Sequence, residues 1–168
     1  MTVTVNELIE AYKMNPHPEG GYYKETYRSG ETLQEECLPI RFRGERIFST
    51  GIYYLLNGEE FSAFHRIKSD EMWHFYAGGP LNIYIIDPAG NFELVTMGQN
   101  FNNGEVFQAV VKSGYWFAAQ PVNPNGFSFM GCTVAPGFDF EDFELAHADQ
   151  LIESFPQHEK LIRQFCRQ

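Results

Sequence analysis

The strongest constraint on the fold of this chain is a series of short apolar segments, each ended by a turn signal. The turns contain glycine, proline or asparagine, as in Asn57-Gly58 and Asp87-Pro88. Turns spaced roughly eight to twelve residues apart are typical of an antiparallel sandwich or barrel. No helical segment intervenes, which argues against a parallel α/β fold. The predicted strands are residues 47–56, 61–67, 71–77, 81–86, 92–97, 106–111, 115–119 and 127–134.

The N-terminal part is expected to contribute a short helix, a strand and a loop. Thr4 and Glu7 have the spacing of a capping box, so a helix is predicted over residues 5–13. Two Pro and two Gly then break the helix before a strand at residues 22–27. The polar stretch 29–45 is predicted to be a long loop.

The C-terminal part changes to a helical period. Residues 143–155 are predicted to form one helix, and Pro156 can begin a second that runs through Phe165. We therefore expect one mainly β domain over residues 1–168, with a short N-terminal helix and short C-terminal helices.

Net charge, cysteine spacing and the absence of long apolar stretches indicate which partners and which location to expect. The net charge of −10 argues against nucleic-acid and membrane roles, because an acidic chain repels phosphate backbones and anionic lipids. Cys37, Cys132 and Cys166 are widely spaced without a C-x-x-C pair, as expected of reduced thiols. The chain shows neither a signal peptide nor a stretch of about 20 apolar residues, so we expect a cytoplasmic protein.

Strand alternation brings one histidine and one carboxylate toward the same place. His65 and Glu71 lie in consecutive predicted strands and would meet near one end of the barrel if both faces point inward. A buried carboxylate facing an imidazole can help bind a metal, can orient the imidazole for proton transfer, or can simply satisfy it. His74 is one step out of phase with Glu71 and is expected to point outward.

The same segment carries a family resemblance. Residues 65–78 have the spacing of a cupin's first motif, G-x5-H-x-H-x3-E-x6-G, with Ile67 in place of the second His. Together with residues 17–29 and 131–146, they resemble the Cupin_5 family, also called domain of unknown function 985. The resemblance implies a double-stranded β-helix (the RmlC-like jelly roll), a homodimer, and a structural likeness to sugar-nucleotide 3,5-epimerases.

The resemblance also implies which metal ligands are present. Metal-binding cupins take two His and a Glu from the first motif and a third His from the second motif. Here His65 and Glu71 match, whereas Ile67 and Phe117 replace the other two ligands. A transition-metal site normally needs at least three protein ligands, so we expect no metal and no other cofactor.

Three functions follow from these residues. The first is a small-molecule cupin, such as a sugar or nucleotide-sugar isomerase or epimerase, with His65 as the base and Glu71 as its orienting partner. The second is a non-catalytic metabolite-binding module, and the third is a metal-dependent oxygenase with His74 rotated inward. The residues expected to bind the ligand are Trp73, Phe75, Phe117, Tyr54 and Tyr115.

Overall fold

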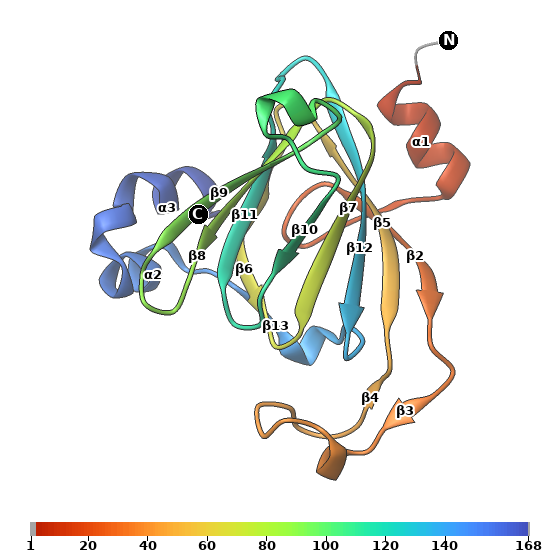
Figure 1. Cartoon of the computed structure of the whole chain (residues 1–168), viewed down its shortest axis with the longest axis vertical. Coiled ribbons are helices and arrows are strands. Elements are labelled where there is room, and N and C mark those ends of the chain that lie inside the picture. Colours follow the sequence, from red (N-terminus) through yellow and green to blue (C-terminus); the bar gives the residue numbers. More distant parts are fainter. Residues whose placement is uncertain (1–2, 168) are drawn as a thin grey trace.

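Two antiparallel sheets lie face to face and hold the main core between them (Figure 1). The structure is a computed structural model that describes residues 3–167. One sheet has the order β1-β2-β5-β12-β7-β10, the other has the order β13-β6-β11-β8-β9, and β3 pairs only with β4. This arrangement confirms the mainly β fold predicted from the sequence.

The strand bounds are as follows. The six-stranded sheet comprises β1 (Asn15–Pro16), β2 (Tyr22–Arg28), β5 (Thr50–Asn57), β12 (Phe127–Ala135), β7 (Asp70–Gly78) and β10 (Gln108–Val111). The five-stranded sheet comprises β13 (Phe143–Leu145), β6 (Ser62–Ile67), β11 (Trp116–Pro121), β8 (Leu81–Ile86) and β9 (Phe92–Met97). The small ribbon comprises β3 (Thr32–Leu33) and β4 (Arg46–Ile47).

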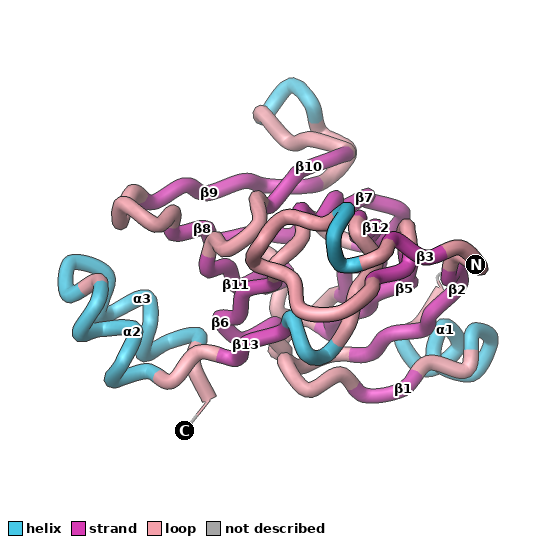
Figure 2. Tube along the Cα trace, turned by 90° about the horizontal axis from the view of Figure 1, so that it is seen from below, coloured by secondary structure: helices cyan, strands magenta, loops and turns pink. Residues whose placement is uncertain are grey.

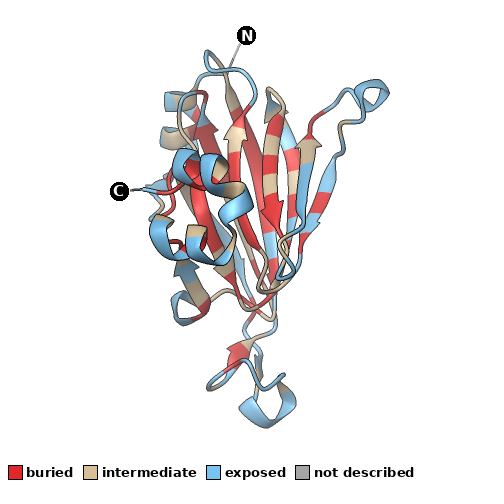
Figure 3. Cartoon of the chain, turned by 90° about the vertical axis from the view of Figure 1, so that its left-hand side faces the viewer, coloured by how far each residue is buried: buried red, intermediate tan, exposed pale blue. Residues whose placement is uncertain are grey.

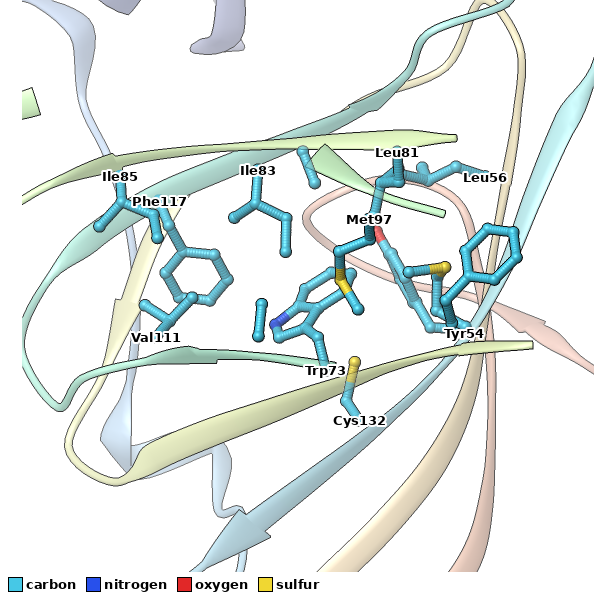
Figure 4. Packing of buried hydrophobic residues seen from close by; sticks show 14 residues of the cluster. Tyr54, Leu56, Trp73, Leu81, Ile83, Ile85, Met97, Val111, Phe117 and Cys132 are labelled. Carbon is cyan, nitrogen blue, oxygen red and sulfur yellow. The ribbon is translucent and has the colours of Figure 1, made fainter. Parts of the chain in front are cut away.

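Side-chain alternation fills the space between the sheets. In β7, Trp73 and Phe75 are buried, whereas Met72 and Tyr76 are exposed on the opposite face. The indole of Trp73 meets the ring of Phe117 from the other sheet edge-on, with centroids 6.2 Å apart. Figure 4 shows both rings packed among aliphatic side chains of the two sheets.

The helix α1 (Val5–Tyr12) covers part of the outer face of the six-stranded sheet. Its capping box is formed, because the Thr4 hydroxyl accepts from the backbone N–H of Glu7 at 3.3 Å. Leu8 is buried against Leu55 and Phe129. The prediction of a helix over residues 5–13 is confirmed to within one residue.

The helices α2 (Ala148–Ser154) and α3 (Glu159–Phe165) cover the outer face of the five-stranded sheet (Figure 3). Leu151, Ile162 and Phe165 from these helices pack against Phe64 and Trp116 from the strands. No helix among residues 3–167 is long and apolar enough to cross a membrane.

The prediction of one helix over residues 143–155 is wrong at its N-terminal end. Phe143–Leu145 forms β13, in which Phe143 lies opposite Ile67 and Leu145 lies opposite His65. The edge of β6 offers backbone partners to this segment, and this pairing overrides the helical period. The strand places Phe143 beside His65, with ring centroids 5.4 Å apart.

The loop predicted over residues 29–45 contains β3 and a 3-10 helix, η1 (Glu35–Cys37). It extends beyond one end of the barrel (Figure 1). A second 3-10 helix, η3 (Phe140–Asp142), lies at the same end and leads into β13 (Figure 2). Two further 3-10 helices are η2 (Phe101–Asn103) and η4 (Pro156–His158).

The packing of α3 can be tested by removing its largest buried side chain. Phe165→Ala is expected to lower the free energy of unfolding by about 3–5 kcal/mol, because the 1% exposed ring leaves a cavity against the sheet. Urea denaturation measures this loss. The control Arg163→Ala, on the exposed side of α3, should change stability by about 0.5 kcal/mol or less, and an equal loss in both variants would contradict the packing.

Candidate functional site

A cavity of about 210 Å³ lies at the end of the barrel where β6 and β12 finish and β5 and β7 begin. This is the end that Figure 2 views. Its ionisable lining residues are His17, Glu19, Glu25, His65, Glu71 and Cys132, with the phenols of Tyr23 and Tyr54. Its remaining walls are Thr50, Ile52, Ile67, Val134, Phe138, Phe140 and Phe143.

His65 is held by acceptors on both ring nitrogens. Its Nδ1 lies 2.8 Å from the carbonyl oxygen of Ala63, which can only accept, so Nδ1 carries a hydrogen. Its Nε2 lies 3.0 Å from Oε2 of Glu19. His65 is 2% exposed and Glu19 is 5% exposed, so this contact is shielded from water. Nε2 is therefore the nitrogen that gains and loses a proton, directly beside a carboxylate.

Three hydrogen bonds fix the turn that carries Glu19. The Ser62 hydroxyl donates to Glu19 Oε1 at 2.9 Å, and the backbone N–H of Ala63 donates to the Glu19 carbonyl at 2.8 Å. The Tyr54 hydroxyl donates to the carbonyl of Gly20 at 2.7 Å. Gly20 has a φ of +124°, and a Cβ there would collide with the carbonyl of Phe61. A glycine is therefore required to bring this turn against the barrel.

His17 lies on the other side of the same carboxylate. Its Nδ1 is 3.4 Å from Glu19 Oε2 and also 3.4 Å from the Glu19 backbone nitrogen. The backbone N–H is a fixed donor, so Nδ1 accepts and the carboxylate contact is not an ion pair. Burial lowers the pKa of His17, which is consistent with a neutral ring. The ring meets Tyr23 edge-on at 4.8 Å.

Glu71 lines the same cavity in a different protonation state. Burial, reinforced by the charge of Glu19, raises the pKa of Glu71 to about 8. The neighbouring Cys132 thiol has its pKa raised well above the usual value, chiefly by burial, and is neutral too. Near neutral pH the cavity therefore presents a protonated carboxyl group at Glu71, which can act as a hydrogen-bond donor or an acid.

The structure changes the pairing that the sequence suggested. His65 and Glu71 do line one cavity, as expected from strand alternation. However, the interpretation of Glu71 as the orienting partner of His65 is wrong, because Glu19 and Ala63 occupy the two ring nitrogens. His17 and Glu19 were not predicted as catalytic or ligand-binding residues. Their one local signal is the Gly20-Gly21 pair, which permits a close turn but does not indicate its partner.

The expected ligand-binding aromatics are divided between the cavity and the core. Tyr54 lines the cavity and also belongs to the buried core, whereas Phe75 belongs to the core alone. Trp73 and Phe117 likewise lie in the core (Figure 4). Tyr115 is half-buried and packs against that core. Trp73 and Phe75 point inward as alternation required, but the cavity occupies only the end of the barrel. Phe117 instead supports the site, because its ring centroid lies 4.0 Å from that of His65.

The residues at the cupin ligand positions do not fit a transition metal. His65 and Glu71 are the two donors, and both nitrogens of His65 already have protein partners. His74 points away from the cavity, as predicted, and its Nε2 contacts the Thr133 hydroxyl at 3.1 Å. Within residues 3–167, no three His, Cys, Asp or Glu side chains are grouped so that they could hold a metal ion.

The protonation of Glu71 has a measurable effect on stability. Between pH of about 4.5 and about 8 the folded protein keeps a proton on Glu71 that the unfolded chain releases, so this residue makes stability fall as pH rises. Glu71→Gln is expected to remove that fall, which urea denaturation at pH 5, 7 and 9 measures. The exposed control Glu153→Gln should keep it. Parallel pH profiles for wild type and Glu71→Gln would contradict the assignment.

Comparison with known proteins agrees with the fold. Residues 6–146 match the family described as Cupin superfamily (DUF985). An uncharacterised protein of Saccharomyces cerevisiae is 35% identical over 150 residues, which cover 83% of this chain and 73% of the yeast protein.

Solved structures extend this likeness to the whole chain. A protein from Shewanella oneidensis is 35% identical, with a TM-score of 0.89 and 99% of both chains covered. A hypothetical protein from Leishmania major has the same identity and TM-score, over 99% of this chain and 100% of that one. Oxalate decarboxylase from Bacillus subtilis shares the fold at 15% identity, with a TM-score of 0.55, 90% of this chain and 36% of that chain. The chain belongs to the Cupin_5 (DUF985) family of the cupin superfamily.

Proposed function

We propose that the cavity binds a small organic molecule and moves a proton on it, as a sugar isomerase or epimerase does. The observation that carries this proposal is the 3.0 Å contact between His65 and Glu19 in a cavity that also contains the buried Glu71. A base held by a carboxylate, together with a protonated acid in the same enclosed space, is the arrangement that general acid–base chemistry needs.

The base is the His65–Glu19 pair. Ala63 holds the hydrogen on Nδ1, so the pair accepts a proton from the ligand at its Nε2–Oε2 contact when neither of these two atoms carries one. The carboxylate of Glu19 compensates the charge of the imidazolium that forms. Ser62 donates to the other oxygen of Glu19, which keeps the carboxylate in this orientation.

The acid is Glu71. Its raised pKa, about 8, keeps a proton available near neutral pH for an oxygen or carbon of the ligand. Tyr54 is less suited to this role, because its hydroxyl already donates to the Gly20 carbonyl. Burial also raises the pKa of Tyr54 well above its usual value. Two carboxyl groups in different environments can thus divide the basic and acidic roles.

Metabolite binding without turnover is the second candidate function. One observation favours it: both nitrogens of His65 and both oxygens of Glu19 already contact protein groups. A pair satisfied in this way can shape a binding site without transferring a proton.

Proton transfer can be tested by hydrogen exchange. Aldoses, ketoses and nucleotide sugars would be incubated with the protein in D2O, and ¹H NMR would follow the loss of carbon-bound hydrogen signals. We expect exchange on at least one compound, and a loss of about 10²-fold or more in His65→Gln and in Glu19→Gln. The matched control is His147→Gln, an exposed histidine outside the cavity, which should exchange at the wild-type rate.

Binding without exchange in the wild-type protein would support the metabolite-binding function instead. Exchange that survives unchanged in His65→Gln would contradict the role of this residue.

We also propose that the chain forms a homodimer through the outer face of the six-stranded sheet. Strand pairing places one row of residues side by side across this sheet. In order, the row contains Tyr27, Gly51, Thr133, Met72 and Val110. Tyr27, Met72 and Val110 are among the exposed large apolar side chains. A row of such residues on a smooth sheet face is suited to pairing with a second copy.

Light scattering coupled to size exclusion tests this assembly. At micromolar concentration we expect twice the mass of one chain, and Met72→Glu with Val110→Glu should give a monomer because two charges would be buried at the contact. The paired change Phe92→Glu with Leu94→Glu, on the exposed face of β9, should leave the dimer intact. A wild-type monomer would contradict the proposal.

A further inference from the structure

The cavity lining contains acidic side chains but no lysine or arginine. Glu19, Glu25 and Glu71 contribute carboxyl groups, whereas none of the lining residues is Lys or Arg. A nucleotide sugar or sugar phosphate brings negative charge that needs cationic partners inside such an enclosed site. The lining therefore disfavours the phosphorylated ligands that the likeness to sugar-nucleotide epimerases would suggest.

Three cationic side chains near this end of the barrel are already paired with carboxylates. Arg28 donates to both carboxylate oxygens of Glu25, at 2.9 and 2.8 Å. Arg46 forms a second two-point contact with Asp142, at 2.7 and 2.8 Å, and Lys68 lies 3.1 Å from the same carboxylate. These pairs hold the surrounding loops together, so a phosphate could recruit their cations only by breaking a structural contact.

Aromatic rings form the wall next to the carboxyl groups. Phe138, Phe140 and Phe143 lie in one cluster, with ring centroids 5.0 to 6.3 Å apart. The ring of His17 stacks on Phe140, and the ring of His65 is tilted over Phe143. The faces of aromatic rings attract cations, most strongly where water is excluded.

Among the three carboxyl groups that line this cavity, that of Glu71 lacks a strong partner. It is 8% exposed and lines the cavity, and the Cys132 thiol is the only hydrogen-bond partner of its carboxyl group among residues 3–167. A thiol is a weak donor, so this carboxyl group is not satisfied by the protein alone. A positively charged ligand group beside it would supply the missing partner and favour its ionised form.

We propose that the cavity takes a compact ligand with a protonated nitrogen, such as an amine or an amino sugar, and excludes phosphorylated ligands. The nitrogen lies beside the carboxyl group of Glu71, in the cavity whose wall includes the rings of Phe140 and Phe143. The cavity of about 210 Å³ is below the roughly 300–1,000 Å³ of most ligand pockets, which also selects a compact molecule. This inference rests on the proposed function only in using the same cavity as the binding site.

Three probes that differ only in their head group test the charge preference. Ethylamine, ethanol and ethyl phosphate would be added at equal concentration and ionic strength to protein labelled with ¹³C at glutamate carboxyl groups. The readout is the titration of the Glu71 carboxyl signal, assigned by its absence in Glu71→Gln. Other ionisable groups of the same cavity are followed in the same spectra or held constant between probes: Glu19, Glu25, His17, His65, Cys132 and Tyr54.

We expect ethylammonium to lower the pKa of Glu71 from about 8 by about one pH unit or more, because an opposite charge within about 4–6 Å favours the carboxylate. Ethanol and ethyl phosphate should leave it in place. Glu71→Gln should weaken ethylammonium binding about tenfold, measured on the Phe143 and His65 ring signals. The control Glu144→Gln, whose carboxylate pairs with Arg66 outside the cavity, should bind as the wild type does.

The inference would be overturned if ethanol lowered the pKa of Glu71 or if ethyl phosphate bound in the cavity. It would also be overturned if ethylammonium left the pKa of Glu71 unchanged. None of these readouts requires turnover, so their outcome is separate from the hydrogen-exchange test of proton transfer.

Discussion

The contact between Glu19 and His65 is the interaction on which the site depends. It joins a turn near the N-terminus to β6, across a separation of more than forty residues, and places a carboxylate against an imidazole away from water. Neither partner could be buried alone at low cost, since an unpaired carboxylate in an apolar setting is strongly destabilising. The same turn also supplies His17 and receives the Tyr54 hydroxyl, so the cavity wall and the acid–base pair form together.

Glu19 and Glu71, the two innermost carboxyl groups of the cavity, have different surroundings. Glu19 has hydrogen-bond donors around it, whereas Glu71 has an apolar surrounding, one weak donor and the charge of Glu19 nearby. Burial and like charge act in the same direction on Glu71, and its pKa rises to about 8. Near neutral pH the cavity without a ligand therefore holds a protonated Glu71, which is the property that the proposed acid–base chemistry uses.

Much of the fold could be predicted because strand alternation and turn residues are local signals. The strands between residues 61 and 134 are all present, with bounds shifted by two residues or fewer, and Glu71 points inward as alternation required. The failures concern long-range partners. Residues 143–145 have a helical period but pair with the edge of β6, and Trp73 and Phe117 point inward but fill the core instead of the cavity. Glu19 lies in a turn without periodicity, so the sequence could not indicate that it, and not Glu71, meets His65.

The most direct test of the account is the hydrogen position on His65, read from the ¹⁵N chemical shifts of its ring nitrogens. The carbonyl of Ala63 requires a hydrogen on Nδ1, which leaves Nε2 as the nitrogen that exchanges a proton beside Glu19. We predict that neutral His65 is the Nδ1–H tautomer, and that Glu19→Gln changes the Nε2 signal far more than the Nδ1 signal. A neutral His65 with its hydrogen on Nε2, or an Nε2 signal indifferent to Glu19→Gln, would contradict the pairing from which the proposed chemistry follows.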